Sequence, residues 1–120
     1  MAWKYHQKTG VITLFDYVVY RHGYSGKGYG RNNPAAESLH ALGPIPQGWY
    51  HIGKPHDSHL GKPTLNLSPE GHNAHGRTLF RIHGDNKNHN YSASEGCIIL
   101  PLDVRQRIAH SGFHRLHVVA

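Results

Sequence analysis

Short apolar stretches, three to five residues long, recur along most of the chain and are separated by glycine, proline and polar residues. They are rich in β-branched and aromatic side chains, and several alternate apolar with polar positions, as β-strands do. We predict strands over residues 3–7, 11–15, 17–20, 49–52, 64–68, 78–82, 98–100 and 116–119. The first is expected at a sheet edge, and the first three are expected to form a meander.

One segment between these strands predicts a short helix over residues 33–42. Asn33 can cap it, and Pro34 suits the first turn, where a backbone N–H is not needed. Leu39 and Leu42 would then face the sheet.

A second helix, about two to three turns long, is predicted over residues 101–112. Val104 and Ile108 lie four positions apart and would share its buried face, while the arginines lie off that face. A chain of 120 residues is long enough for one modest core. The pattern therefore predicts one mainly β domain over residues 1–120, with two short helices.

Charge and hydropathy bear on the choice of partners. Thirteen Lys and Arg against 7 Asp and Glu give a formal charge of +6, which favours polyanions such as nucleic acid or the bacterial envelope. The basic residues are scattered rather than gathered on one element, which disfavours nucleic acid.

No apolar run approaches the roughly 18 residues of a membrane-spanning helix, and residues 1–8 lack the apolar core of a secretory signal.

The candidate chemistry centres on the only cysteine, Cys97. It follows a Ser94-Glu-Gly96 turn and opens an apolar run, and His83 lies 14 positions upstream, at the end of another such run. If the two strands are neighbours, facing Cβ atoms lie about 5 Å apart, so an imidazole could take the thiol proton. A lone cysteine is also explained as a small buried hydrophobic residue. The turn and the upstream His-Gly pair favour a nucleophile.

These motifs resemble the active-site signature of the YkuD-type L,D-transpeptidases. The resemblance rests on residues 82–87 (Ile-His-Gly-Asp-Asn-Lys), residues 93–101 (Ala-Ser-Glu-Gly-Cys-Ile-Ile-Leu-Pro) and the Pro-x-Gly-x-Tyr-x-Ile segment of residues 46–52. The resemblance covers nearly the whole chain. The chain is similar in particular to small L,D-transpeptidase-like toxins delivered by type VI secretion systems. Those toxins attack the peptide stems of bacterial peptidoglycan, as carboxypeptidases and by exchanging D-amino acids.

The resemblance implies an L,D-transpeptidase-like β-sandwich or barrel that works through a cysteine acyl-enzyme. Cys97 would attack the carbonyl of the residue before the terminal D-alanine, and His83 would be base for the thiol and acid for the leaving amine. The N–H groups of Gly96 and Cys97 would hold the oxyanion. Ser94 or Asp85 would orient the imidazole or the turn, and either is equally explained as a local turn former.

The chain departs from the family pattern at two positions near the cysteine. The second histidine, usual just before Gly-Cys, is Glu95, and the Arg or Asn usual two positions after the cysteine is Ile99. Because that polar residue often helps to grip the stem peptide, substrate binding must differ here. The residues expected to supply compensating contacts, in and after a flexible glycine-rich loop at residues 23–30, are Tyr24, Ser25, Lys27 and Asn33.

The resemblance also implies where the protein acts and with what. The substrate would be a peptidoglycan stem peptide in the periplasm of a target bacterium, reached without a signal peptide through a component of the secretion machine. A cognate immunity protein would block the cleft. No metal or other cofactor, no nucleic acid and no membrane span is expected.

Two alternatives stay open. The pairs His56–His59 and His72–His75 could suggest a zinc site, although neither pair matches His-Glu-x-x-His on a helix. The segment 83–89, together with the positive charge, allows a metal-dependent nuclease, in which Cys97 would have no role. A non-catalytic module that binds the cell envelope is the second alternative. It predicts that Cys97→Ala keeps all activity.

Overall fold

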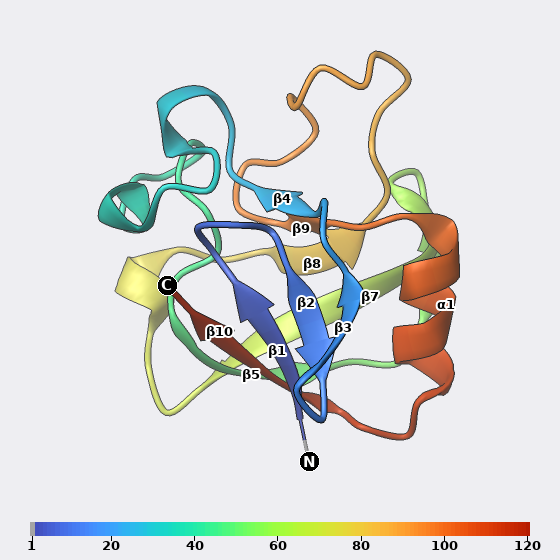
Figure 1. Cartoon of the computed structure of the whole chain (residues 1–120). Helices are drawn as coiled ribbons and strands as arrows, with labels where there is room; N and C mark the ends of the chain where they lie inside the picture. Colours follow the sequence, from blue (N-terminus) through green and yellow to red (C-terminus); the bar gives the residue numbers. More distant parts are fainter. Residues whose placement is uncertain (1) are drawn as a thin grey trace.

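The computed structural model describes residues 2–120, which form a sheet around one apolar core (Figure 1). The strands are β1 (Trp3–His6), β2 (Ile12–Leu14), β3 (Tyr17–Tyr20), β4 (Tyr24–Ser25), β5 (Gly48–Ile52), β6 (His56–Ser58), β7 (Gly61–Glu70), β8 (Phe80–His83), β9 (Ile98–Ile99) and β10 (Arg115–Val119). Within the described residues there is one α-helix, α1 (Leu102–His110). Three single 3-10 turns accompany it: η1 (Gly28–Gly30), η2 (Pro34–Ala36) and η3 (Ala74–Gly76).

The strands follow the order β3-β2-β1-β10-β5-β7-β8-β9-β4, and β6 pairs with β7 off this path. Most neighbours are antiparallel, but β1 pairs with β10 in parallel, and so does β8 with β9. Parallel neighbours need a long connection, and residues 84–97 supply it between β8 and β9. Figure 1 shows β1, β2 and β3 in front of β7 and β8, so the sheet folds over on itself.

The core lies between the two halves of this folded sheet. Trp3 and Tyr5 of β1 are buried against the same cluster as Leu65 of β7 and Ile82 of β8. Alternate positions along each strand point to one face, which explains the apolar–polar alternation of the sequence. Burying each such side chain contributes about 1.5–3 kcal/mol, so this cluster is the main source of stability.

The predicted mainly β class is confirmed, and so is the meander of the first three strands, which pair as β1-β2-β3. The edge position of the first strand was wrong, because β1 lies between β2 and β10. The loop predicted at residues 23–30 contains β4, which pairs with β9 and is therefore part of the sheet.

The helix predicted over residues 33–42 is wrong, since only the single turn η2 forms there. Asn33 does cap this turn, accepting a hydrogen bond from the Ala35 N–H at 3.1 Å. Leu39 and Leu42 are 40% and 39% exposed and do not face the sheet. The guanidinium of Arg77 binds the backbone carbonyl groups of Glu37, Gly43 and Pro44, of which only that of Glu37 lies within the predicted helix.

The C-terminal helix is confirmed as α1, with Val104 and Ile108 buried as expected. Of the two arginines predicted to lie off this face, Arg107 is exposed, whereas Arg105 is buried, at 6% exposure. No helix among the described residues is long and apolar enough to cross a membrane.

Candidate active site

β8 and β9 bring the two predicted catalytic residues together. The strands pair in parallel, with Ile82 opposite Ile98 and His83 opposite Ile99. Cys97 directly precedes β9, so it lies one position before this register begins. Ile82 and Ile98 both point into the core. The neighbouring positions on each strand therefore point to the opposite face.

His83 and Cys97 share this opposite face of the strand pair, and so does Arg81. If the register is continued backwards by one residue, Cys97 lies opposite Arg81. His83 then lies two residues after Arg81 on the same strand. Diagonal neighbours on paired strands lie about 7–8 Å apart, within reach of long side chains. The two residues are thus neighbours on one face, diagonal rather than directly facing.

The turn before Cys97 is held by two buried serine hydroxyls. Ser94 Oγ accepts hydrogen bonds from the Gly26 N–H at 2.9 Å and the Gly96 N–H at 3.2 Å, and it donates to the Cys97 carbonyl at 2.6 Å. Ser25 Oγ donates to the Gly96 carbonyl at 3.3 Å and accepts from the backbone N–H of residue 45 at 2.8 Å. Both serines shape the turn and touch neither the imidazole nor open solvent.

Gly96 is required in this turn for two reasons. Its φ of +136° lies in a region that side chains disfavour, and a Cβ there would meet Arg77 Nη2 at 2.5 Å. Its N–H already donates to Ser94 Oγ, so the predicted oxyanion role of Gly96 requires this bond to be exchanged.

His83 is 2% exposed, and a backbone carbonyl sets its tautomer. Its Nδ1 lies 2.8 Å from the Gly84 carbonyl oxygen, which can only accept, so Nδ1 carries the proton and Nε2 of the neutral ring is a free base. Burial lowers the pKa of His83, and the charges of Arg81 and Arg105 lower it further, against the opposing Gly84 carbonyl and Asp85 carboxylate.

Cys97 is also nearly enclosed, at 8% exposure. Its thiol points to the Leu79 carbonyl oxygen, 3.6 Å from Sγ. Burial raises the pKa of Cys97, while the backbone N–H and guanidinium of Arg81 oppose that rise. The thiol and the imidazole are therefore both favoured in their neutral forms, the protonation states from which a general base can act.

A cavity of about 280 Å³ opens beside the Cys97 sulfur. Arg77 and Arg81 line it together with Glu95, so its walls carry two guanidinium groups and one carboxylate. His40 also lines the cavity. Arg77 also holds the backbone of the cavity wall, because it donates a hydrogen bond to the Glu95 carbonyl at 3.0 Å. The cavity thus combines a thiol with an environment that attracts a carboxylate.

The predicted substrate-binding residues are divided between different tasks. Lys27 forms a surface ion pair with Glu95 at 2.9 Å, beside the cavity. Tyr24 is buried and donates to Asp85 Oδ1 at 2.7 Å, away from Cys97. Ser25 belongs to the turn, and Asn33 caps η2, so these two residues hold the backbone.

Asp85 makes its contacts away from the imidazole. Its Oδ1 also accepts from the Asn86 N–H at 2.9 Å, and its Oδ2 lies 3.4 Å from His89 Nδ1. The group bonded to the His83 ring is instead the Gly84 carbonyl.

A family model assigns the chain to a group of known proteins. The model of the Tlde1 domain matches residues 20–120, which include both strands of the candidate site. The chain belongs to the Tlde1 domain family. This is a family of antibacterial type VI secretion effectors, so the predicted type VI toxin family is confirmed. No curated protein and no solved structure matches the chain.

Membership of the Tlde1 family has two consequences for this chain. Its relatives are delivered into target cells, and the family carries the expectation of a cognate immunity protein. Both agree with what the active-site motifs implied.

Two arginines at the site of this Tlde1-family chain were not predicted from the sequence motifs. Arg81 alternates with His83 in one strand, and this spacing of two could have placed both on one face. Arg77 had no such signal, because it lies in an irregular segment and all its partners are distant in sequence.

Three of the four paired histidines that suggested a metal site are engaged elsewhere. His56 lies 3.1 Å from Asn66 Oδ1, His72 lies 3.0 Å from the Trp49 carbonyl oxygen, and His75 pairs with a glutamate carboxylate at 2.8 Å. Within residues 2–120, no three His, Cys, Asp or Glu side chains are grouped so that they could hold a metal ion.

Proposed function

We propose that this protein is a cysteine L,D-transpeptidase or L,D-carboxypeptidase that acts on peptidoglycan stem peptides, with residues 1–120 as its catalytic domain. The observation that carries the proposal is the parallel pairing of β8 and β9, with His83 and Cys97 as diagonal neighbours on one face. The tautomer of His83 supports it, because Nε2 is left as the basic nitrogen.

The resting pair favours general-base catalysis over a preformed thiolate–imidazolium pair. Both pKa shifts, down for His83 and up for Cys97, stabilise the neutral forms. The thiol turns from the Leu79 carbonyl toward Nε2, which takes its proton as sulfur attacks the scissile carbonyl. The imidazolium then gives this proton to the leaving amine, and a thioester remains on Cys97.

The cavity beside Cys97 supports the substrate class. Its cationic residue Arg81 suits the carboxylate of a terminal D-alanine, whose amide bond lies next to that carboxylate. The N–H of Cys97, joined by that of Gly96 once it leaves Ser94, stabilises the oxyanion. Ile99 provides no polar contact with the stem peptide, so Arg81 makes this contact in its place.

The thioester is resolved by one of two acceptors. Water gives a shortened stem peptide, and an amine such as a D-amino acid gives exchange or cross-linking. The substrate lies in the periplasm of the target cell, reached through the secretion machine, and the cognate immunity protein covers the cleft.

The decisive experiment is digestion of purified muropeptides followed by mass spectrometry. Wild type should release terminal D-alanine or replace it with another D-amino acid, and Cys97→Ala and His83→Ala should give no product. His110→Ala, which removes an exposed histidine of α1, is the matched control and should retain wild-type activity.

Two inhibitors separate this proposal from its alternatives. Iodoacetamide should abolish activity, and EDTA should leave it unchanged, whereas a metal-dependent nuclease would show the reverse. Equal product from Cys97→Ala and wild type would refute a cysteine enzyme and leave the envelope-binding module.

A further inference from the structure

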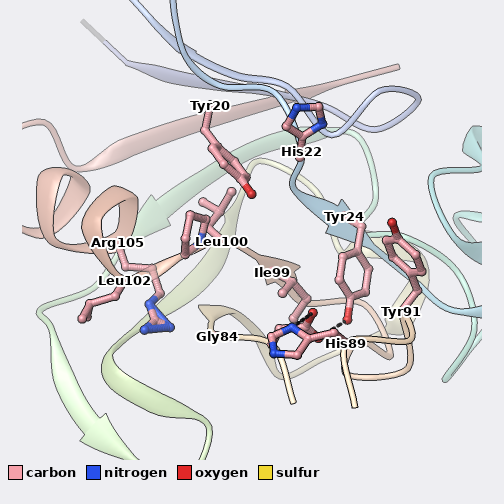
Figure 2. A pocket seen from close by; sticks show the side chains of 12 residues that line it. Tyr20, His22, Tyr24, Gly84, His89, Tyr91, Ile99, Leu100, Leu102 and Arg105 are labelled. Atoms are coloured by element: carbon pink, nitrogen blue, oxygen red, sulfur yellow. Dashed lines mark hydrogen bonds and ion pairs between the residues drawn. The ribbon is translucent and has the colours of Figure 1, made fainter. Parts of the chain in front are cut away.

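A second and larger cavity, of about 490 Å³, lies beyond the His83 end of the same strand pair. Ile99, the register partner of His83, lines it together with Gly84 and Asp85. Figure 2 shows Arg105 of α1 on one side of this cavity and Tyr24 and His89 on the other. The proposed mechanism for Cys97 leaves this cavity unused.

Arg105 is a buried cation without a partner. It is 6% exposed, and its Nε and Nη1 are enclosed with no hydrogen-bond acceptor. Nη1 packs against Gly84, where a Cβ would approach it to 2.4 Å. A guanidinium with two enclosed nitrogens that lack acceptors is costly to bury. Its charge attracts an anion to the cavity that it lines, where Nη2, which is not among the enclosed atoms, is left to bind that anion.

The opposite wall of the cavity carries an anion. Tyr24 and the Asn86 N–H both donate to Oδ1 of Asp85, which fixes the carboxylate. Its Oδ2 has only the long 3.4 Å contact to His89, whose side chain is mostly exposed. Oδ2 therefore retains capacity to accept a hydrogen bond from a cationic ligand.

We propose that this cavity binds the zwitterionic group of an amino acid, with its carboxylate at Arg105 and its ammonium at Asp85. One fixed cation and one fixed anion across a small cavity match this ligand better than a simple anion or cation. Two sources share the chemistry: a free amino acid, or the amino-acid end of a diaminopimelate side chain in a stem peptide.

For a free amino acid, the use of the site rests on the proposed function. The cavity begins at Ile99, which lies two residues after Cys97 on the same face, about 7 Å away. The ligand first loses one ammonium proton to solvent. Its neutral amine then attacks the thioester carbonyl: a C–N bond forms, the C–S bond breaks, and the second proton passes through His83 to the Cys97 sulfur. The product is an exchanged stem peptide.

Binding is tested on the Cys97→Ala protein by amide chemical shifts in ¹⁵N NMR. D-alanine and L-alanine are titrated beside D-alaninamide and N-acetyl-D-alanine, which each lack one of the two charges. We expect a free alanine to shift Gly84 and Asp85, and both neutralised analogues to bind at least about tenfold more weakly, since each loses a charge-assisted contact. Equal binding of D-alaninamide, or no shift at these residues with any alanine or muropeptide, would overturn the proposal.

Muropeptides distinguish the two sources. If only a stem peptide with diaminopimelate binds, and its lysine counterpart does not, the ligand is the side-chain end of the substrate. If a free alanine binds, the site serves an acceptor. Both results support the zwitterion site.

Arg105→Gln and Asp85→Asn should each weaken this binding at least about tenfold, and Arg107→Gln, on the exposed side of the same helix, should not. If Arg105→Gln fails to fold, the binding measured with Asp85→Asn is sufficient to test the proposal. Release of D-alanine by wild type that depends on Cys97, without any zwitterion binding, would refute this inference and leave the proposed function intact.

Discussion

Two buried arginines, Arg77 and Arg105, lie at opposite ends of the β8–β9 pair and differ in how their charge is satisfied. Arg77 is 5% exposed and its guanidinium donates four hydrogen bonds to the carbonyl groups of Glu37, Gly43, Pro44 and Glu95. Arg105 is 6% exposed, and its Nε and Nη1 have no acceptor.

The difference separates a structural cation from a binding one. Arg77 ties the segment around residues 37–44 to the turn before Cys97, so its charge is used by the fold. Arg105 lies beside a cavity and next to Gly84, so its charge is left for a ligand. Burial alone does not distinguish these roles, but the number of acceptors does.

The largest effect is expected from Arg77→Met. This change leaves buried carbonyl groups without donors and removes hydrogen bonds from a charged group, so it should lower the free energy of unfolding by at least about 3 kcal/mol. Urea unfolding measures it, and muropeptide assays should show no activity because the Cys97 turn loses its support. A loss under about 1 kcal/mol would contradict the structural role.

Gly96→Ala should follow, with a loss of about 2 kcal/mol in unfolding free energy. The added Cβ combines a φ of +136° with a 2.5 Å approach to Arg77, which is held by its hydrogen bonds and cannot move aside. Displacing Cys97 by about 1 Å should reduce D-alanine release about 100-fold. Wild-type activity in a folded Gly96→Ala protein would disprove the need for this turn.

The dependence on pH distinguishes the neutral pair from an ion pair. Activity should rise with pH along an acid limb whose midpoint lies below 6.5, because the pKa of His83 is lowered and its neutral form is the base. Alkylation of Cys97 should accelerate only above the ordinary thiol range, because its pKa is raised. Removing a nearby cation with Arg105→Met should move the acid limb upward. Rapid alkylation at about pH 6 would indicate a thiolate instead.

Gly84→Ala is the counterpart of Gly96→Ala at the other end of the strand pair. A Cβ would approach Arg105 Nη1 to 2.4 Å, but this guanidinium has no hydrogen bonds there and can move. The cost should be about 1 kcal/mol, at the low end for an added methyl group. Thermal unfolding checks this, and a cost equal to that of Gly96→Ala would show that Arg105 is held as firmly as Arg77.

The smallest effect on stability is expected from Arg105→Met. Replacing a buried, unpaired charge with an apolar side chain of similar length should leave the unfolding free energy within about 1 kcal/mol of wild type, or raise it. Amino-acid binding should be lost in the same variant. A destabilisation as large as that of Arg77→Met would show that Arg105 is structural.

The local patterns of the sequence predicted much of the fold. Alternating apolar residues specified most strands, because side chains of a strand alternate between two faces whatever its neighbours are. The spacing of Val104 and Ile108 likewise specified α1 and its buried face. The helix at residues 33–42 does not form, and the Glu37 carbonyl inside this segment binds Arg77, a residue 40 positions away.

For the candidate site, the sequence by itself predicted a nucleophile–base motif, because Cys97 and His83 stand in recognisable local contexts. Only the tertiary structure decided that their strands run parallel, that the two residues are diagonal, and that Gly84 rather than Asp85 bonds the imidazole. The physical reason is that register, burial and hydrogen-bond partners depend on contacts between distant segments, which no local spacing records.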